Sequence, residues 1–181
     1  MDKKITPAYI LIGIFAVFFT WIIHEFAHWA TSELYGYKTI MELNTTSLAN
    51  GENPTKGQEA IISAAGPLIT LLQAFIAFLW LKYRNWNKYI YPFLFITFYM
   101  RFLASIMNFV SLNDEGRISV FLEIGTFTLP IIISTVLFYL VYSTSKKHHI
   151  NWKFQLATIF IVMVTSSVLI LADQYLSLRI L

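Results

Sequence analysis

Five long apolar segments dominate the pattern of the chain. They cover residues 7–34, 60–81, 89–112, 126–142 and 154–171. About 20 mostly apolar residues suffice for a helix to cross the hydrocarbon core of a bilayer. A helix is expected in each segment because it satisfies its own backbone hydrogen bonds, whereas an open strand edge cannot face lipid. The pattern therefore predicts an all-α bundle of about five transmembrane helices.

Two connections have patterns of their own. Residues 36–57 are polar with scattered apolar positions, and the stretch YKTIMELN predicts a short strand or hairpin there. Residues 113–125 hold the densest charge cluster of the chain. Four residues of that segment fall on one helical face: Ile118, Phe121, Leu122 and Gly125. This face predicts a short interfacial helix, within a chain that forms one transmembrane domain over residues 1–181.

Composition strengthens the membrane interpretation. The chain is 57% hydrophobic and only 13% charged, whereas soluble domains have about 25% charged residues. We expect a multi-pass integral protein of a bacterial or archaeal cell membrane, in direct contact with the lipid bilayer. The absence of cysteine excludes disulfides, thiolate zinc sites and cysteine nucleophiles. The net charge of +3 is too small and too dispersed to indicate nucleic-acid binding.

Basic residues are unevenly divided between the two sides of a five-span bundle. The N-terminal side would carry Lys3, Lys4, Lys82, Arg84, Lys88, Lys146, Lys147 and Lys153, and the opposite side Lys38, Lys56, Arg117 and Arg179. Because cytoplasmic connections are enriched in Lys and Arg, this bias predicts a cytoplasmic N-terminus. Arg101 lies inside the third span, where we expect it to snorkel or to pair within the bundle.

The first apolar segment contains a polar cluster, WIIHEFAHWA, at residues 21–30. His24 and His28 are four residues apart, so on a helix they project from one face and can share one tetrahedral metal ion. Glu25 lies about 100° around the helix, within reach of a metal-bound water. A structural polar cluster is the alternative, but a charge at mid-membrane costs roughly 2.5–3.5 kcal/mol and favours a functional site. HExxH on a helix is typical of zinc peptidases.

A catalytic zinc usually has three protein ligands, so a third must come from elsewhere. His148 and His149 follow the fourth span, and we expect them to be solvated at the other end of the bundle. The carboxylate candidates are Glu33, Glu42, Glu52, Glu59, Asp114, Glu115, Glu123 and Asp173. Glu33 is on the same helix as the histidines and cannot easily close a tetrahedron. Asp114 follows the third span on the side where the first span ends, which makes it the best candidate.

Three segments together resemble the site-2 protease family of intramembrane zinc metalloproteases, as a small member with a minimal core. HEFAH resembles the HExxH of that family, and AAGPL at residues 64–68 resembles its Ala-Gly-Pro segment. NFVSLNDEGRI at residues 108–118 resembles its Asn-x-x-Pro-x-x-x-Leu-Asp-Gly-Gly segment, with the proline absent, Glu115 in place of the first glycine and two residues fewer. For AAGPL taken alone we expect close helix packing by small residues.

The resemblance implies a three-helix core over about residues 8–124, with additional helices at about 126–174. It implies one catalytic Zn²⁺ bound by His24, His28 and Asp114, with Glu25 as the general base. It also implies that Asn108 binds substrate or stabilises the oxyanion, although an interhelical hydrogen bond explains that residue equally well. In the family the active site opens toward the cytoplasm, which is opposite to the orientation that the basic residues predict.

The expected function is therefore a zinc metalloendopeptidase that cleaves transmembrane or membrane-associated proteins, with room for a regulatory membrane partner. A substrate helix must unwind before attack, and the YKTIMELN stretch would hold the unwound segment by strand addition. The alternative is a catalytically silent membrane protein of the same fold that binds metal or a client protein. A di-iron hydroxylase is disfavoured, because such sites need many histidines and this chain has four.

Overall fold

A computed structural model describes residues 2–49, 51–176 and 178–181, which form six helices and two short strands. In chain order these are α1 (Pro7–Leu34), β1 (Thr39–Met41), β2 (Thr46–Leu48), α2 (Lys56–Tyr83), α3 (Tyr91–Met107), α4 (Asp114–Phe121), α5 (Thr128–Lys147) and α6 (Trp152–Leu176). The predicted helical bundle is confirmed. Four helices, α1, α2, α5 and α6, are long and apolar enough to cross a membrane. The third predicted span is shorter than expected, because α3 ends at Met107 after 17 residues.

The two helices that form most of the site begin at capping residues. Thr6 precedes α1, and its hydroxyl accepts a hydrogen bond from Tyr9 N–H at 3.2 Å. Thr55 precedes α2 and forms a reciprocal capping box with Gln58. Each cap satisfies backbone N–H groups that a helix leaves unpaired in its first turn. α1 therefore begins at Pro7, as the sequence predicts, whereas α2 begins at Lys56, before the predicted apolar segment 60–81.

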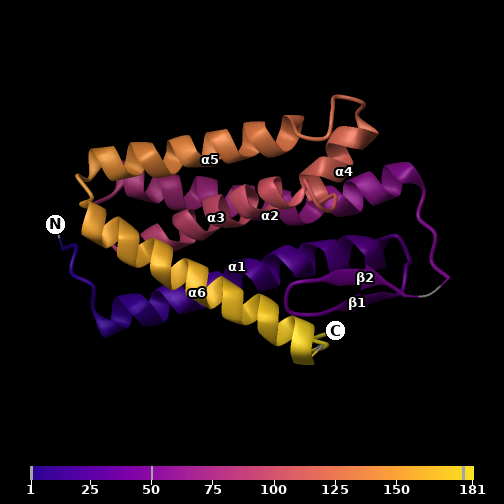
Figure 1. Cartoon of the computed structure of the whole chain (residues 1–181), viewed down its shortest axis with the longest axis horizontal. Helices are drawn as coiled ribbons and strands as arrows, with labels where there is room; N and C mark the ends of the chain where they lie inside the picture. The colour runs from indigo at the N-terminus through magenta and orange to yellow at the C-terminus, as the bar shows by residue number, and fades with distance from the viewer. Residues whose placement is uncertain (1, 50, 177) are drawn as a thin grey trace.

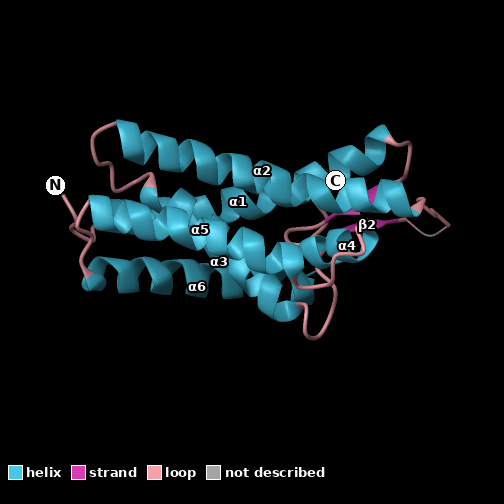
Figure 2. Ribbon diagram, turned by 90° about the horizontal axis from the view of Figure 1, so that it is seen from above, coloured by secondary structure: helices cyan, strands magenta, loops and turns pink. Residues whose placement is uncertain are grey.

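The helices form a bundle that is apolar outside as well as inside. Figure 1 shows α1, α2, α3, α5 and α6 running alternately between the two ends of the bundle, and Figure 2 shows the same bundle from above. Val17, Leu94 and Leu137 are buried in its interior, whereas Phe75 and Phe160 are exposed on its outer surface. Exposed apolar side chains along helices of this length are expected where lipid replaces water.

The N-terminal segment meets two loops at one end of the bundle. The Lys88 ammonium lies 2.7 Å from the Asp2 carboxylate, and Trp86 Nε1 donates to the Asp2 carbonyl at 2.8 Å. His148 is buried at this end, with its Nε2 2.7 Å from the Leu81 carbonyl. The prediction that His148 is solvated is therefore wrong, because the loop folds back onto α2 and Trp86. His149 is exposed, as predicted.

The opposite end carries the predicted hairpin, formed by β1 and β2 as an antiparallel pair. Ile40 lies opposite Ser47. Two further backbone hydrogen bonds flank this pair, from Ala49 N–H to the Lys38 carbonyl and from Glu42 N–H to the Thr45 carbonyl, each at 2.8 Å. Because paired and unpaired positions alternate along an antiparallel ladder, the backbone groups of Thr46 and Leu48 point away from β1. The outer edge of β2 is thus open within the described residues.

Three neighbours hold the hairpin in place. Thr46 Oγ1 donates to the Glu25 carbonyl of α1 at 3.0 Å. The Asp173 carboxylate of α6 accepts from Leu43 N–H in the hairpin turn at 2.9 Å. On the outer edge of β1, Met41 N–H donates to the Leu181 carbonyl at 3.1 Å. The chain end therefore covers the β1 edge, while β2 remains the open one.

The predicted short helix between the third and fourth apolar segments is present as α4. Its inward face is polar or small, with Glu115, Gly116 and Ser119 buried. Phe121 and Leu122, which belong to the predicted apolar face, are exposed on the outside. This orientation turns the acidic start of α4 toward α2 and α3, and thus toward the site.

Candidate metal centre

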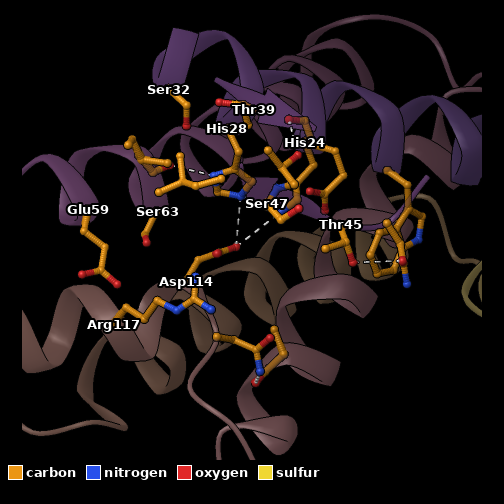
Figure 3. A pocket seen from close by; sticks show the side chains of 18 of the residues that line it. His24, His28, Ser32, Thr39, Thr45, Ser47, Glu59, Ser63, Asp114 and Arg117 are labelled. Carbon is orange, nitrogen blue, oxygen red and sulfur yellow. Dashed lines mark hydrogen bonds and ion pairs between the residues drawn. The ribbon is translucent and has the colours of Figure 1, made fainter. Parts of the chain in front are cut away.

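The two histidines of α1 and the first residue of α4 converge on one point. Asp114 Oδ2 lies 3.1 Å from His24 Nε2 and 3.4 Å from His28 Nε2. The two Nε2 atoms are 3.2 Å apart. Figure 3 shows Asp114 pointing toward both histidines from the facing wall of the cavity. Asp114, which is 90 positions from His24 in the sequence, thus brings a third ligand atom to the two histidines.

The dimensions of this triangle fit a tetrahedral metal ion. Zinc binds imidazole nitrogen and carboxylate oxygen at about 2.0–2.1 Å, so its ligand atoms stand roughly 3.3 Å apart. The three observed separations of 3.1, 3.2 and 3.4 Å correspond to three edges of such a tetrahedron. Two imidazoles and a carboxylate suit zinc but also other divalent metals. The three residues are therefore a candidate metal-binding triad.

A backbone carbonyl orients one of the two imidazoles. His28 Nδ1 lies 2.7 Å from the Ile62 carbonyl of α2. A carbonyl can only accept, so the Nδ1 of His28 carries the proton and its Nε2 keeps a lone pair for a metal. His24 Nδ1 is buried and has no hydrogen-bond partner among the described residues. A hydrogen bond thus fixes the orientation of the His28 ring, whereas the His24 ring has no such bond at its Nδ1.

Gly66 of α2 packs directly against both imidazoles. A Cβ at this position would lie 2.3 Å from His28 Nε2 and 2.5 Å from His24 Nδ1. Separations this short are steric clashes, so only glycine lets α2 approach the rings. The sequence predicts close helix packing for AAGPL, but it does not identify the histidine rings as the partner. No signal in the sequence identifies this contact, because it depends on how α1 and α2 pack against each other.

Asn108 braces the turn that leads into α4. Its Oδ1 accepts from Asn113 N–H at 2.8 Å, and its Nδ2 donates to the Ala104 carbonyl at 3.0 Å. Gly116 lies against the same side chain, since a Cβ there would be 2.2 Å from Asn108 Oδ1. The cavity lining includes Asn113 but does not include Asn108. The structure therefore places Asn108 behind the site, and its catalytic role stays a prediction.

The surroundings of the Asp114 carboxyl act on its pKa in opposite directions. Burial opposes ionisation, but contact with the imidazoles of His24 and His28 holds the pKa of Asp114 well below its usual range. An ionised carboxylate is the form that binds a divalent cation.

A buried ion pair adjoins the triad. Arg101 of α3 donates from Nη1 to Glu115 Oε1 at 2.8 Å, and both residues are buried. Arg101 Nη2 is 3.4 Å from His24 Nε2, and Nη1 is 3.6 Å from Asp114 Oδ2. The expectation that Arg101 pairs within the bundle is confirmed. Its position beside the ligands was missed, because a single arginine in an apolar segment carries no sign of its partner.

The triad forms part of the wall of a cavity of about 920 Å³. Glu25 is buried and lines this cavity, together with Arg101. Much of the remaining lining is polar: Ser32, Thr39, Ser47, Glu59, Ser63 and Arg117. A polar cavity of this size can hold water beside the triad.

The other carboxylate candidates lie outside the triad, and most have a contact of their own. Glu33 accepts from Thr39 N–H at 2.9 Å, and Glu52 accepts from Lys38 N–H at 3.2 Å. Asp173 holds the hairpin turn. Within the described residues, Asp114 is the carboxylate that meets both histidines.

Comparisons of this chain with known protein families, with curated proteins and with solved structures found no match. The geometry of the cavity and the chemistry of its side chains are therefore the features that bear on function.

Proposed function

We propose that this protein is a membrane-embedded zinc metallopeptidase of the site-2 protease type, which hydrolyses peptide bonds of transmembrane or membrane-associated proteins in a bacterial or archaeal cell membrane. One observation carries the proposal. Three groups with the chemistry of zinc ligands converge at 3.1–3.4 Å, and the glutamate of the same HExxH motif lines the adjoining cavity.

In this proposal His24 Nε2, His28 Nε2 and Asp114 Oδ2 bind the ion. Zinc held there would act as a Lewis acid and make water a nucleophile near neutral pH. Glu25 takes a proton from the attacking water, whose oxygen bonds to the peptide carbonyl carbon. The Glu25 carboxyl then delivers that proton to the departing nitrogen as the C–N bond breaks. The products are a carboxylic acid and an amine, which become a carboxylate and an ammonium once the acid proton passes to the amine, so atoms and charge balance.

The open edge of β2 is the proposed holding site for the unwound substrate. β2 lines the cavity, and the backbone groups of Thr46 and Leu48 point away from β1. An extended segment can add to such an edge through main-chain hydrogen bonds, which work with any side chain. The sequence favours YKTIMELN for this role. We assign it to β2, because the β1 edge within YKTIMELN already pairs with residues 180–181.

Metal content and cleavage together test the proposal. Purified wild-type protein should bind one zinc per chain and cleave a mixture of fluorescent single-span peptides in detergent micelles. Glu25→Gln should retain the zinc and lose about 10²–10⁴-fold in cleavage rate, the usual contribution of a general base. Asp114→Ala should lose most of the zinc. Glu123→Gln is the matched control, because Glu123 is an exposed carboxylate, and it should change neither property.

Each alternative has its own signature in this experiment. A folded wild type without bound metal would contradict the metal site itself. One zinc per chain with no cleavage of any peptide would favour the catalytically silent protein that binds metal or a client. Full cleavage by purified Glu25→Gln would show that the assigned base is wrong.

A further inference from the structure

The Arg101–Glu115 pair lies at the cavity wall and has no part in the mechanism above. Arg101 is 4% exposed and Glu115 is 1% exposed, yet Arg101 is among the residues that line the cavity. Arg101 comes from α3, and Glu115 follows the candidate ligand Asp114 in the first turn of α4. A buried ion pair of this kind is costly to desolvate and is weak support for a fold. Its presence here therefore needs a further reason.

The guanidinium is placed where it would oppose metal binding on its own. It lies 3.4 Å from His24 Nε2 and 3.6 Å from Asp114 Oδ2. A bare positive charge at this distance repels a divalent cation bound by the same atoms. Glu115 Oε1, 2.8 Å from Nη1, offsets that charge. The pair thus allows an arginine to remain beside the triad without excluding the metal.

The pair is also incompletely satisfied, which is unlike a structural ion pair. Arg101 Nε and Glu115 Oε2 are both buried and have no hydrogen-bond partner among the described residues. Buried ion pairs stabilise a fold only when their remaining donors and acceptors are also bonded. The arrangement instead keeps a planar set of N–H donors at the edge of the cavity, with capacity for another acceptor.

We propose that Arg101, held in position by Glu115, is the anion-binding group of this site and donates to the substrate carbonyl oxygen as that oxygen becomes negatively charged. This inference rests on the proposed peptidase function. Donors fixed in advance where charge develops stabilise the transition state, because they need no reorganisation during the reaction. Arg101 is then a catalytic residue, and Glu115 is its positioning residue.

Asp114 and Glu115 are adjacent in the sequence, and this proposal gives each of them a separate role. The first turn of α4 supplies one carboxylate to the triad and the next one to Arg101. The same short element thereby sets the distance between the metal ligands and the anion-binding group. A glycine at position 115 would leave the buried guanidinium without its counter-charge.

Anion binding to cobalt-loaded protein tests this role without any cleavage. Phenylphosphonate serves as a tetrahedral anion and imidazole as a neutral metal ligand, and both are followed through the visible spectrum of cobalt. Arg101→Gln should weaken phenylphosphonate binding about 10–100-fold, the range for a charged hydrogen bond. Imidazole affinity and one cobalt per chain should be unchanged. Arg101→Lys should bind phenylphosphonate more weakly than the wild type and more tightly than Arg101→Gln, since lysine keeps the charge but not the planar guanidinium.

The double variant Arg101→Gln/Glu115→Gln guards against misfolding, because it leaves no buried charge unpaired. It should show the same selective loss of phenylphosphonate binding. Glu115→Gln alone leaves the guanidinium charge without its offset, so it should lower cobalt affinity. At saturating cobalt it should weaken phenylphosphonate binding less than Arg101→Gln and leave imidazole binding intact. Unchanged phenylphosphonate affinity in the double variant, or a parallel loss of imidazole affinity, would overturn the proposal.

The outcomes separate this inference from the proposed function. If the wild type binds no cobalt, both fail. If it binds cobalt and phenylphosphonate in an Arg101-dependent way but cleaves no peptide, the anion site stands and the peptidase function fails. If the wild type cleaves peptides, Arg101→Gln should lower kcat about 10²–10³-fold with KM nearly unchanged. Equal kcat values would overturn the role of Arg101 while leaving the peptidase intact.

Discussion

Gly66, Ile62 and Asn108 carry no charge, yet they determine how the candidate ligands are presented. Gly66 gives the imidazoles room, the Ile62 carbonyl orients His28, and Asn108 braces the turn before Asp114. The histidine pair itself follows from local helical spacing, so it could be predicted from the sequence. Its supporting neighbours could not, because they come from other helices and are ordinary residues taken one at a time.

Gly66→Ala should damage the triad by steric clash. The added Cβ would lie 2.3 Å from His28 Nε2, so the imidazoles or α2 must shift. We expect zinc affinity to fall at least 10-fold and the protein to lose about 1–3 kcal/mol of stability, as for an overpacked core. Gly57→Ala on the same helix is the control, because a Cβ there meets nothing within 4 Å. Equal zinc affinity in the two variants, measured by competition with a chelating dye, would contradict this role of Gly66.

Asn108→Ala distinguishes a positioning role from a catalytic one. Removal of the amide leaves Asn113 N–H without its acceptor and takes one of three donors from the Ala104 carbonyl, and this loosens the turn before Asp114. We expect zinc affinity to fall about 10–100-fold, as for supporting residues of other metal sites. A direct contact of Asn108 with substrate predicts the reverse: unchanged zinc affinity and a lower kcat. Zinc titration followed by steady-state kinetics at saturating zinc separates the two results.

Among the elements, the hairpin depends on helices from both ends of the chain. α1 holds β2 through Thr46, and α6 holds the turn through Asp173. The strand tendency of YKTIMELN could be predicted from its composition, and so could the short helix after α3. The fastening by α6 could not, because Asp173 is 130 residues from its partner Leu43. α6 thereby contributes to the cavity although it supplies no member of the triad.

Asp173→Ala should release the hairpin turn while leaving the triad intact. The carboxylate accepts from Leu43 N–H at 2.9 Å and from Asn44 N–H at 3.3 Å. Loss of both acceptors should cost about 1–3 kcal/mol locally and speed hydrogen exchange at these two amides. Zinc content should stay at the wild-type level, whereas KM for peptide should rise. Asp173→Asn keeps one acceptor oxygen, so its hydrogen-exchange rates should lie between those of the wild type and of Asp173→Ala. Slow exchange in Asp173→Ala would contradict the role of Asp173 in holding the hairpin turn.

For the whole molecule, the two ends of the bundle differ in charge and in chemistry. The N-terminal end gathers Lys88 and Lys147, which contact Asp2 and the Lys82 carbonyl. The triad, the hairpin and α4 are grouped toward the other end, as Figure 1 shows for the elements. The excess of basic residues predicts that the N-terminal end faces the cytoplasm. The triad would then open toward the opposite side, contrary to the orientation usual in site-2 proteases.

Labelling of single cysteines tests this orientation directly, because the natural chain has none. Lys146→Cys reports on the N-terminal end and Lys38→Cys on the hairpin end, and both positions are exposed. In intact cells, a membrane-impermeant maleimide should label Lys38→Cys and leave Lys146→Cys unlabelled until the cells are lysed. The opposite pattern would show that the charge bias misleads and that the triad faces the cytoplasm.

The sequence by itself determined the apolar segments, the helical character of the bundle and the spacing of His24 and His28, because these depend on neighbours within one or a few turns. It also singled out Asp114, through the side of the bundle on which the third segment ends. Only the tertiary structure decided that Asp114 meets both imidazoles, that Gly66 makes room for them and that Arg101 and Glu115 stand beside them. These contacts join helices far apart in the sequence, and their distances depend on how closely whole helices pack.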